Sequence, residues 1–307
     1  MRKRLFPLLA ILLVLTFALL SFACTTPIED INPPPASPEE PPPVPPTDAE
    51  SEPSGDESID GEENTNGDEA TNDDENGDKI IDSENDGVTP HTVTEHRFTS
   101  GSVTMGYLLY TPQSATEGMP LIVYLHGGSG KGSDLALLTA GDGFPQYLCN
   151  GRLGNLPAYV LIPQLPQSYT GWENVTEALL ALIGQVTSSC HINAQNISLT
   201  GHSMGGTGVW SIAAASPATF ARIAPLSGSV RSAQDKLKPL VSMPIYTFVG
   251  SADTVVDPAS TKNFVSALQN RNNSVTLVTL EGATHFDVPA LAYLSDTYGL
   301  INWLIDA

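Results

Sequence analysis

Two patterns of apolar and polar positions follow each other along this chain. At 92–98 and 102–110, on either side of a Ser100-Gly101 turn, the pattern predicts a pair of strands. Farther along, continuous apolar runs predict buried strands at 120–126, 158–162, 196–200, 223–226, 245–249 and 275–280. Amphipathic or small-residue stretches predict helices at 173–188, 205–215, 258–269 and 289–305. This order predicts an α/β domain over residues 91–307, with a mostly parallel central sheet and helices on both faces.

The first 24 residues have a different pattern, typical of an export signal. Residues 2–4 are all basic, and the run at 5–22 is almost entirely apolar before the small residue Ala23. A basic start, an apolar core and a small residue at the end indicate a signal peptide. The apolar run is also long enough to span a bilayer, so an uncleaved membrane anchor is the alternative.

The end of this segment, Ser21-Phe22-Ala23-Cys24, resembles the lipobox of bacterial lipoproteins. It departs from that pattern at Ser21 and at Phe22. The resemblance implies that Cys24 carries lipid and becomes the mature N-terminus. The domain is then expected outside the cytoplasm, tethered to a membrane at the cell surface or otherwise secreted.

Residues 25–90 predict a disordered linker. Its first part, 32–46, is rich in proline and is expected to be a stiff spacer. Its second part, 48–87, has almost no large apolar residues, so burial cannot offset the entropy of ordering it. The run at 74–78 has the oxygen ligands of a calcium loop but lacks the glutamate and helices of an EF-hand.

Charge is concentrated in the same linker. Of the 34 acidic residues, 21 lie between Thr25 and Pro90, and the whole chain has a net charge of −21. A nucleic acid partner is therefore not expected, because its phosphates would be repelled. Export permits disulfides, so Cys149 and Cys190 are expected either to form a bridge or to remain two buried thiols.

The pentapeptide Gly201-His202-Ser203-Met204-Gly205 joins a predicted strand to a helix of small residues. A serine on so sharp a turn has a strained backbone and needs small neighbours. The turn also exposes its oxygen at a helix N-terminus, where negative charge is favoured. We therefore interpret Ser203 as a nucleophile rather than as a serine that only caps the helix.

A serine nucleophile needs a base, and the base needs a carboxylate that orients it. His285 follows the last predicted strand, which places it over the carboxyl edge of the sheet. Asp253 follows the strand at 245–249 and is the predicted acid. The chain order Ser203, Asp253, His285 is the order of the α/β-hydrolase fold.

Two other aspartates are alternatives for the acid. Asp257 precedes Pro258, which is typical of an N-cap followed by proline in the first turn of a helix. That structural role explains Asp257 without chemistry. Asp287 is the remaining candidate.

Backbone N–H groups are expected to bind the oxyanion. One donor is predicted at Met204, the residue after the nucleophile. The second is expected at Gly128, in the glycine-rich turn at 126–130. His202, whose side chain is expected to point away from that of Ser203, is a candidate for substrate binding.

Several short motifs accompany the pentapeptide: Leu125-His126-Gly127-Gly128, Lys131-Gly132-Ser133-Asp134, Pro163-Gln164, Trp172 and Pro225-Leu226-Ser227-Gly228. Together they resemble an esterase and peptidase group of α/β hydrolases that is similar to polyhydroxybutyrate depolymerases and to feruloyl and acetyl-xylan esterases. The likeness runs from about Ser102 to the C-terminus. It implies the triad above and an acyl-serine intermediate, with no cofactor and no metal. Trp172 is expected to line the acyl or alcohol pocket, with burial in the core as the alternative.

The segment at 227–242, where many relatives carry a lid, is short, so no large lid domain is expected. An open site suits short acyl groups on bulky or polymeric alcohols. The sequence therefore predicts a carboxylic ester hydrolase, with ester decorations of polysaccharide as one substrate class. A serine peptidase of the same fold and a non-catalytic, surface-binding lipoprotein are the alternatives, and the oligomeric state is open.

Overall fold

The computed structural model describes residues 91–141, 143–231, 237–272 and 274–306. The export segment predicted at 1–24, with the lipidation site Cys24, and the linker predicted at 25–90 lie outside these residues. Both stay predictions. None of the described helices is long and apolar enough to cross a membrane.

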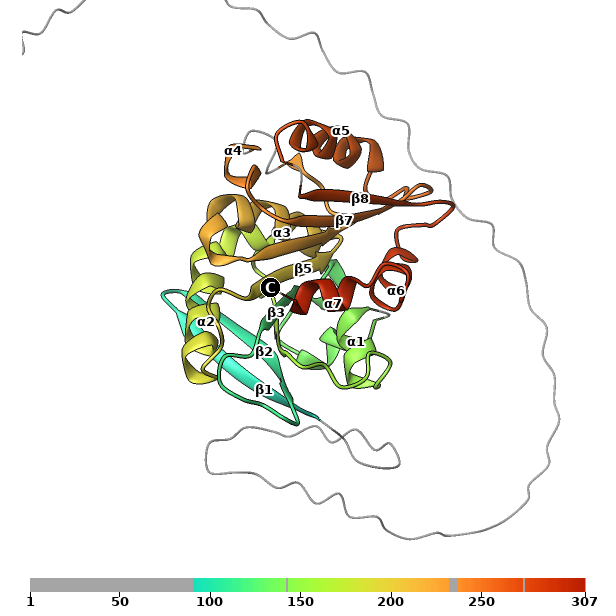
Figure 1. The fold of residues 1–307 in the computed structure, drawn as a ribbon. Helices are drawn as coiled ribbons and strands as arrows, with labels where there is room; N and C mark the ends of the chain where they lie inside the picture. The colour runs from blue at the N-terminus through green and yellow to red at the C-terminus, as the bar shows by residue number, and fades with distance from the viewer. Residues whose placement is uncertain (1–90, 142, 232–236, 273, 307) are drawn as a thin grey trace, which may run out of the picture. The chain divides into compact units, whose positions relative to one another are not determined.

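The described strands form one eight-stranded sheet in the order β1-β2-β4-β3-β5-β6-β7-β8 (Figure 1). β1 pairs antiparallel with β2, and β2 antiparallel with β4, while the remaining neighbours pair in parallel. The carboxyl ends of six parallel strands therefore meet at one edge. The strands are β1 (His91–Ser100), β2 (Val103–Pro112), β3 (Leu121–Leu125), β4 (Tyr159–Pro163), β5 (Ile197–His202), β6 (Arg222–Leu226), β7 (Ile245–Gly250) and β8 (Val275–Leu280).

The central strands are apolar at successive positions because helices cover both faces of the sheet. Every residue of β3 is buried. Leu121, Val123 and Leu125 join one hydrophobic cluster, whereas Ile122 and Tyr124 join the other. Alternate side chains of a strand point to opposite faces, so a continuous apolar run supplies both clusters.

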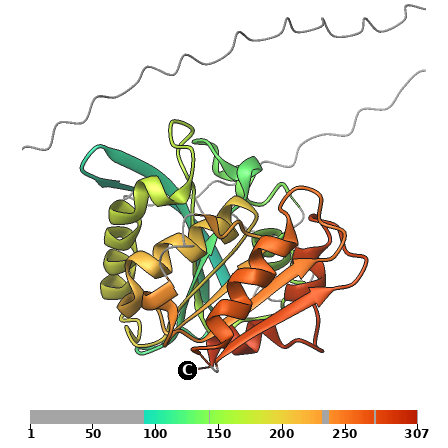
Figure 2. The ribbon, with the colours of Figure 1, turned by 90° about the horizontal axis from the view of Figure 1, so that it is seen from above.

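Three longer helices pack against the first cluster, namely α2 (Thr176–Ser189), α3 (Met204–Ala215) and α5 (Pro258–Gln269). In Figure 2 these helices, coloured olive, gold and orange, stand in a row on one side of the sheet. The opposite cluster receives the shorter helices α1 (Phe144–Cys149), α6 (Val288–Tyr293) and α7 (Leu300–Ile305). The predicted sheet with helices on both faces is confirmed.

The remaining helical elements are short and lie in the connections between the strands and the longer helices. They are η1 (Gly128–Gly130), η2 (Leu135–Leu138), η3 (Trp172–Val175), η4 (Pro217–Thr219) and α4 (Leu237–Leu240). Residues 227–244 join β6 to β7, which is too short a connection for a separate lid domain. The expectation of a fold without a large lid is confirmed.

One predicted helix is wrong in its extent. The stretch at 289–305 forms two short helices, α6 and α7, instead of one. The break includes Gly299, which has a left-handed φ of 56° immediately before α7. A helix cannot continue through that conformation, and glycine adopts it without a Cβ penalty.

Cys149 and Cys190 are both free thiols in the structure. Cys149 packs against the cluster on the α1 face, and Cys190 against the cluster on the α2 face. The two residues therefore belong to opposite sides of the sheet, so the alternative of a bridge between them is wrong. Burial raises the pKa of the Cys149 thiol to about 11, which keeps it protonated near neutral pH.

Candidate active site

Ser203 lies at the turn between β5 and α3, where the backbone is strained. Its φ is 60° and its ψ is −121°, a region that residues with a Cβ rarely adopt. A Cβ on Gly201 would lie 2.5 Å from the carbonyl oxygen of Leu125, and one on Gly205 would overlap the same oxygen. The turn can therefore form only with glycine on both sides of Ser203, and it leaves the serine partly accessible at the start of the helix.

Asp253 and His285 meet at the same edge of the sheet. The Nδ1 atom of His285 lies 2.8 Å from Oδ2 of Asp253, and both side chains are almost completely buried. A carboxylate only accepts hydrogen bonds, so Nδ1 carries the proton. In the neutral imidazole, Nε2 is then unprotonated and able to take a proton.

The second carboxylate oxygen of Asp253 is held by its own loop. Oδ1 accepts hydrogen bonds from the backbone N–H groups of Val255 and Val256, each at 2.9 Å. Burial alone would raise the pKa of Asp253, but these N–H groups and His285 outweigh it, and the pKa lies below its ordinary value. Asp253 is therefore ionised throughout the neutral range.

The loops that carry Asp253 and His285 are joined to each other. The backbone N–H of Ala252 donates to the carbonyl of Ala283 at 3.0 Å. A Cβ on Gly250 would overlap that same carbonyl oxygen, so the two loops pack backbone to backbone. This contact fixes the separation of the carboxylate and the imidazole.

His202 connects the nucleophile turn to the loop of His285. Its Nε2 lies 2.9 Å from the carbonyl oxygen of His285, and the two rings are 4.5 Å apart. Because a carbonyl only accepts, Nε2 of His202 is the donor. Burial, followed by repulsion from His285, lowers the pKa of His202 to about 4, so the ring is neutral at pH 7. The predicted substrate-binding residue His202 thus contacts the loop of His285.

The glycine-rich turn after β3 lies against the nucleophile. A Cβ on Gly127 would be 3.5 Å from Cβ of Ser203, whereas Gly128 is exposed, with open space around its Cα. The structure therefore places Gly127 directly beside Ser203 and the predicted donor Gly128 one position farther along. Met204, the other predicted donor, is the first residue of α3.

Asp257 and Asp287 have structural roles in the same region. Asp257 accepts a hydrogen bond from the N–H of Ala259 at 2.9 Å and caps α5, as predicted. Asp287 accepts from the N–H and the hydroxyl of Thr284, and so closes the turn that contains His285. In the described part of the chain it is Asp253, and not these two aspartates, that is hydrogen-bonded to the imidazole of His285.

This chain is similar to known hydrolases. Residues 165–289 match the Dienelactone hydrolase family. A thermostable esterase structure aligns with a TM-score of 0.60 and 25% identity over 68% of this chain. This chain covers 61% of that esterase. The described domain has the α/β-hydrolase fold.

Two more distant structures share only the fold. A feruloyl esterase module from Clostridium thermocellum, complexed with sinapinate, has 16% identity and a TM-score of 0.53, covering 70% of this chain and 86% of its own. An S-formylglutathione hydrolase from Staphylococcus aureus has 14% identity and a TM-score of 0.54, covering 70% of this chain and 97% of its own. No curated protein sequence matches this chain.

Two buried residues hold the turn after β3, and the sequence alone does not indicate this role. Nδ1 of His126 lies 2.6 Å from the carbonyl of Gly127, and its Nε2 accepts from the N–H of Leu165 at 2.9 Å. The buried amide of Gln164 donates to the carbonyls of Gly130 and Asp134. Both residues occur in the short motifs named above, but only the fold shows what they bind.

Trp172 belongs to the same support and is completely buried. Its indole N–H donates to the carbonyl of His126 at 3.1 Å. A Cβ on Gly208 of α3 would clash with its side chain, so helix and indole are in close contact. The structure thus places Trp172 in the core, the alternative to its predicted place in a substrate pocket.

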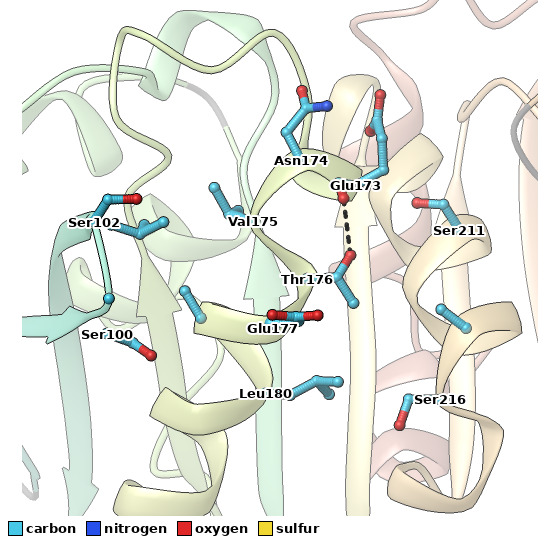
Figure 3. A pocket seen from close by; sticks show the side chains of 14 residues that line it. Ser100, Ser102, Glu173, Asn174, Val175, Thr176, Glu177, Leu180, Ser211 and Ser216 are labelled. Atoms are coloured by element: carbon cyan, nitrogen blue, oxygen red, sulfur yellow. Dashed lines mark hydrogen bonds between the residues drawn. The ribbon is translucent and has the colours of Figure 1, made fainter.

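A hollow of about 780 Å³ is lined by the β1–β2 turn, by η3 and α2, and by α3, and none of Ser203, Asp253 and His285 lines it. Figure 3 shows Ser100 and Ser102 of the turn, Glu173 and Glu177, and Ser211 of α3 around it. The Thr176 hydroxyl donates to the Glu173 carbonyl at 3.1 Å within this lining. The candidate active site is therefore identified by its chemistry and not by this hollow.

Proposed function

We propose that this domain is a serine esterase that hydrolyses carboxylic esters through an acyl-serine intermediate. The observation that carries the proposal is the buried pair of Asp253 and His285, 2.8 Å apart, next to the strained turn of Ser203. A serine hydroxyl becomes a useful nucleophile only with such a base, and the base keeps the right tautomer only with such an acid.

In the proposed acylation step, Oγ of Ser203 bonds to the ester carbonyl carbon while Nε2 of His285 takes the hydroxyl proton. The carbonyl π electrons move onto the oxygen, which the N–H groups of Met204 and of the turn at Gly127-Gly128 bind. Collapse of this tetrahedral species breaks the bond to the alcohol oxygen. That oxygen leaves with the proton from Nε2.

Deacylation repeats these steps with water. His285 takes a proton from the water, whose oxygen bonds to the acyl carbon, and returns it to Oγ of Ser203 as the acid is released. Asp253 stabilises the imidazolium in both halves. No other group is needed to balance the protons or the electrons.

The substrate class that we propose is an ester of a short acyl group with a bulky or polymeric alcohol, such as an acylated polysaccharide. The short connection at 227–244 supports it, because it leaves no domain to cover a long acyl chain. The similar structures include feruloyl esterases, which supports the same class without deciding it.

We also propose that the chain is exported and tethered to a membrane through lipid on Cys24. The support is the basic, apolar and small-residue pattern of residues 1–24. Expression of the full chain in a bacterial host with an alkyne-labelled fatty acid should label the protein. Cys24→Ser should abolish the label; a label that survives this change would contradict the proposal.

The esterase proposal is tested by labelling with a fluorophosphonate and by hydrolysis of para-nitrophenyl acetate. We expect wild-type protein to react and Ser203→Ala to lose both reactions with unchanged folding by circular dichroism. Labelling that persists in Ser203→Ala would show another nucleophile. Faster cleavage of a matched para-nitroanilide than of the ester would favour the peptidase.

A further inference from the structure

Large apolar side chains are exposed beside the catalytic loops. Three of them are Phe286, 72% exposed, Val255, 58% exposed, and Leu291, 44% exposed. Leu137 is also exposed, but it belongs to η2 and to neither loop. Phe286 follows His285 directly, and Val255 lies two residues after Asp253. Single exposed apolar residues need no explanation, but a group of them beside a site indicates that something apolar binds there.

Phe286 also forms one wall of a hollow of about 350 Å³ between the His285 loop and α6. Its apolar lining comes from the loop and from α6. The side chains that matter to the argument are Ala283, Phe286, Ala290 and Leu291, with Glu281 and Asp287 as its charged members. No basic side chain is among the described residues that line it.

Phe286 connects the hollow to the imidazole of His285. The rings of Phe286 and His285 meet edge to face, 5.3 Å apart at an interplanar angle of 90°. Phe286 therefore contacts the imidazole and also lines the hollow.

The reaction decides which part of the substrate lies on this side of the site. His285 returns its proton to the leaving oxygen, so the alcohol must lie against the His285 loop. The ester carbonyl oxygen points the other way, toward the N–H groups at Met204 and the Gly127-Gly128 turn. The acyl part and the alcohol part therefore occupy different sides of Ser203.

We propose that the hollow beside Phe286 binds the apolar part of the leaving alcohol. This inference rests on the proposed esterase function and adds the side of the substrate that the site selects. Phe286 and Leu291 supply the contact surface. Glu281 and Asp287 disfavour alcohols that carry negative charge, because like charges repel at this range.

The test varies the alcohol at a fixed acyl group. Acetate esters of methanol, benzyl alcohol and 2-naphthylmethanol all give the same acetyl-enzyme, so differences in kcat/KM report acylation alone. We expect Phe286→Ser to lower kcat/KM for the naphthylmethyl ester roughly tenfold, from the lost apolar contact. The methyl ester should change by less than about twofold.

Leu291→Ser provides a second measurement. Leu291 lies on α6 and lines the hollow, and its substitution leaves the contact between Phe286 and His285 in place. It should lower kcat/KM for the naphthylmethyl ester about threefold. Leu137→Ser, an equivalent change at an exposed leucine of η2, is the matched control and should leave all three esters unchanged.

Three results would overturn the inference. Equal losses for all three alcohols in both variants would make Phe286 and Leu291 supports of the loop. If the loss of kcat/KM in the variants instead grows with acyl chain length in a series of methyl esters, the hollow binds the acyl group. A dimer that dissociates in Phe286→Ser would assign it to a second copy of the chain. Failure of Ser203→Ala to abolish hydrolysis would instead reject the esterase proposal itself.

Discussion

At the scale of single residues, the carboxylate of Asp253 has two separate tasks, since Oδ1 holds its own loop and Oδ2 holds the imidazole of His285. Asp253→Asn should lower kcat by about 10³- to 10⁴-fold with little change in KM, because an amide N–H beside Nδ1 selects the wrong tautomer. Steady-state kinetics on para-nitrophenyl acetate measures the effect.

Asp257→Asn is the matched control for this prediction. It removes the same charge from the same loop, and asparagine caps a helix about as well as aspartate. We expect activity within about twofold of wild type. Equal losses in the two variants would mean that charge or loop order, and not orientation of His285, accounts for the effect.

Two buried histidines predict how stability depends on pH. Burial lowers the pKa of His126 and of His202 to about 4. In the unfolded chain both pKa values are near 6.5, so from pH 6.5 down to about 4 the unfolded state binds protons that the folded state does not. Stability from both groups is complete above pH 6.5 and falls as the pH drops through that window.

Urea unfolding at pH 7.5 and pH 4.5 measures this loss. His202→Gln keeps an N–H donor for the carbonyl of His285 but cannot titrate. The midpoint should therefore fall less between the two pH values in this variant than in wild type. An identical fall in both proteins would contradict the low pKa of His202.

The candidate roles of residues could be predicted from the sequence where these roles follow from the order of the strands along the chain. Ser203, Asp253 and His285 each come directly after an apolar run, so their meeting at one edge was predictable. The hydrogen bonds by which His126, Gln164 and Trp172 support the turn after β3 were not predictable. These hydrogen bonds are to backbone groups whose positions depend on how the turn after β3 folds against the end of β4.

At the scale of elements, glycines decide whether β5 can turn into α3. Gly205→Ala should destabilise the domain severely, by about 3 kcal/mol or more, because its Cβ would overlap the carbonyl oxygen of Leu125. Thermal unfolding of the purified variant, or its failure to fold, is the readout.

Gly184→Ala is the control for that prediction. Gly184 lies within α2, and an added Cβ would meet nothing within 4 Å. Alanine there should raise stability by about 0.5–1 kcal/mol, since it restricts the unfolded chain and suits a helix. Similar destabilisation of both variants would count against close packing at the turn.

The sequence pattern predicts an element correctly where burial is continuous along that element. It fails where a single residue interrupts an apolar run. The parallel strands were predicted within a few residues because both faces of each are covered. The stretch at 289–305 is apolar enough for one helix, yet the left-handed Gly299 divides it into α6 and α7. Packing of both short helices on the sheet sets that conformation, and the hydrophobic periodicity of the sequence carries no information about this packing.

At the scale of the whole molecule, the order of the strands within the sheet could not be predicted from the sequence. The pattern predicts a mostly parallel sheet, but it does not indicate that β3 lies between β4 and β5. That order follows from crossovers on both faces of the sheet. It also brings the turn after β3 beside Ser203, so the oxyanion donors depend on topology as much as on glycine content.

The described domain begins at β1, and this start predicts where the chain can be shortened. β1 pairs with β2 along its full length and buries Val93. A chain of residues 91–307 should therefore fold and keep kcat/KM for para-nitrophenyl acetate within about twofold of the full protein. A chain that begins at Val103 lacks β1 and exposes the edge of β2, so it should aggregate. Equal activity and solubility of both shortened chains would show that β1 is dispensable, and inactivity of both would place an essential part of the enzyme before residue 91.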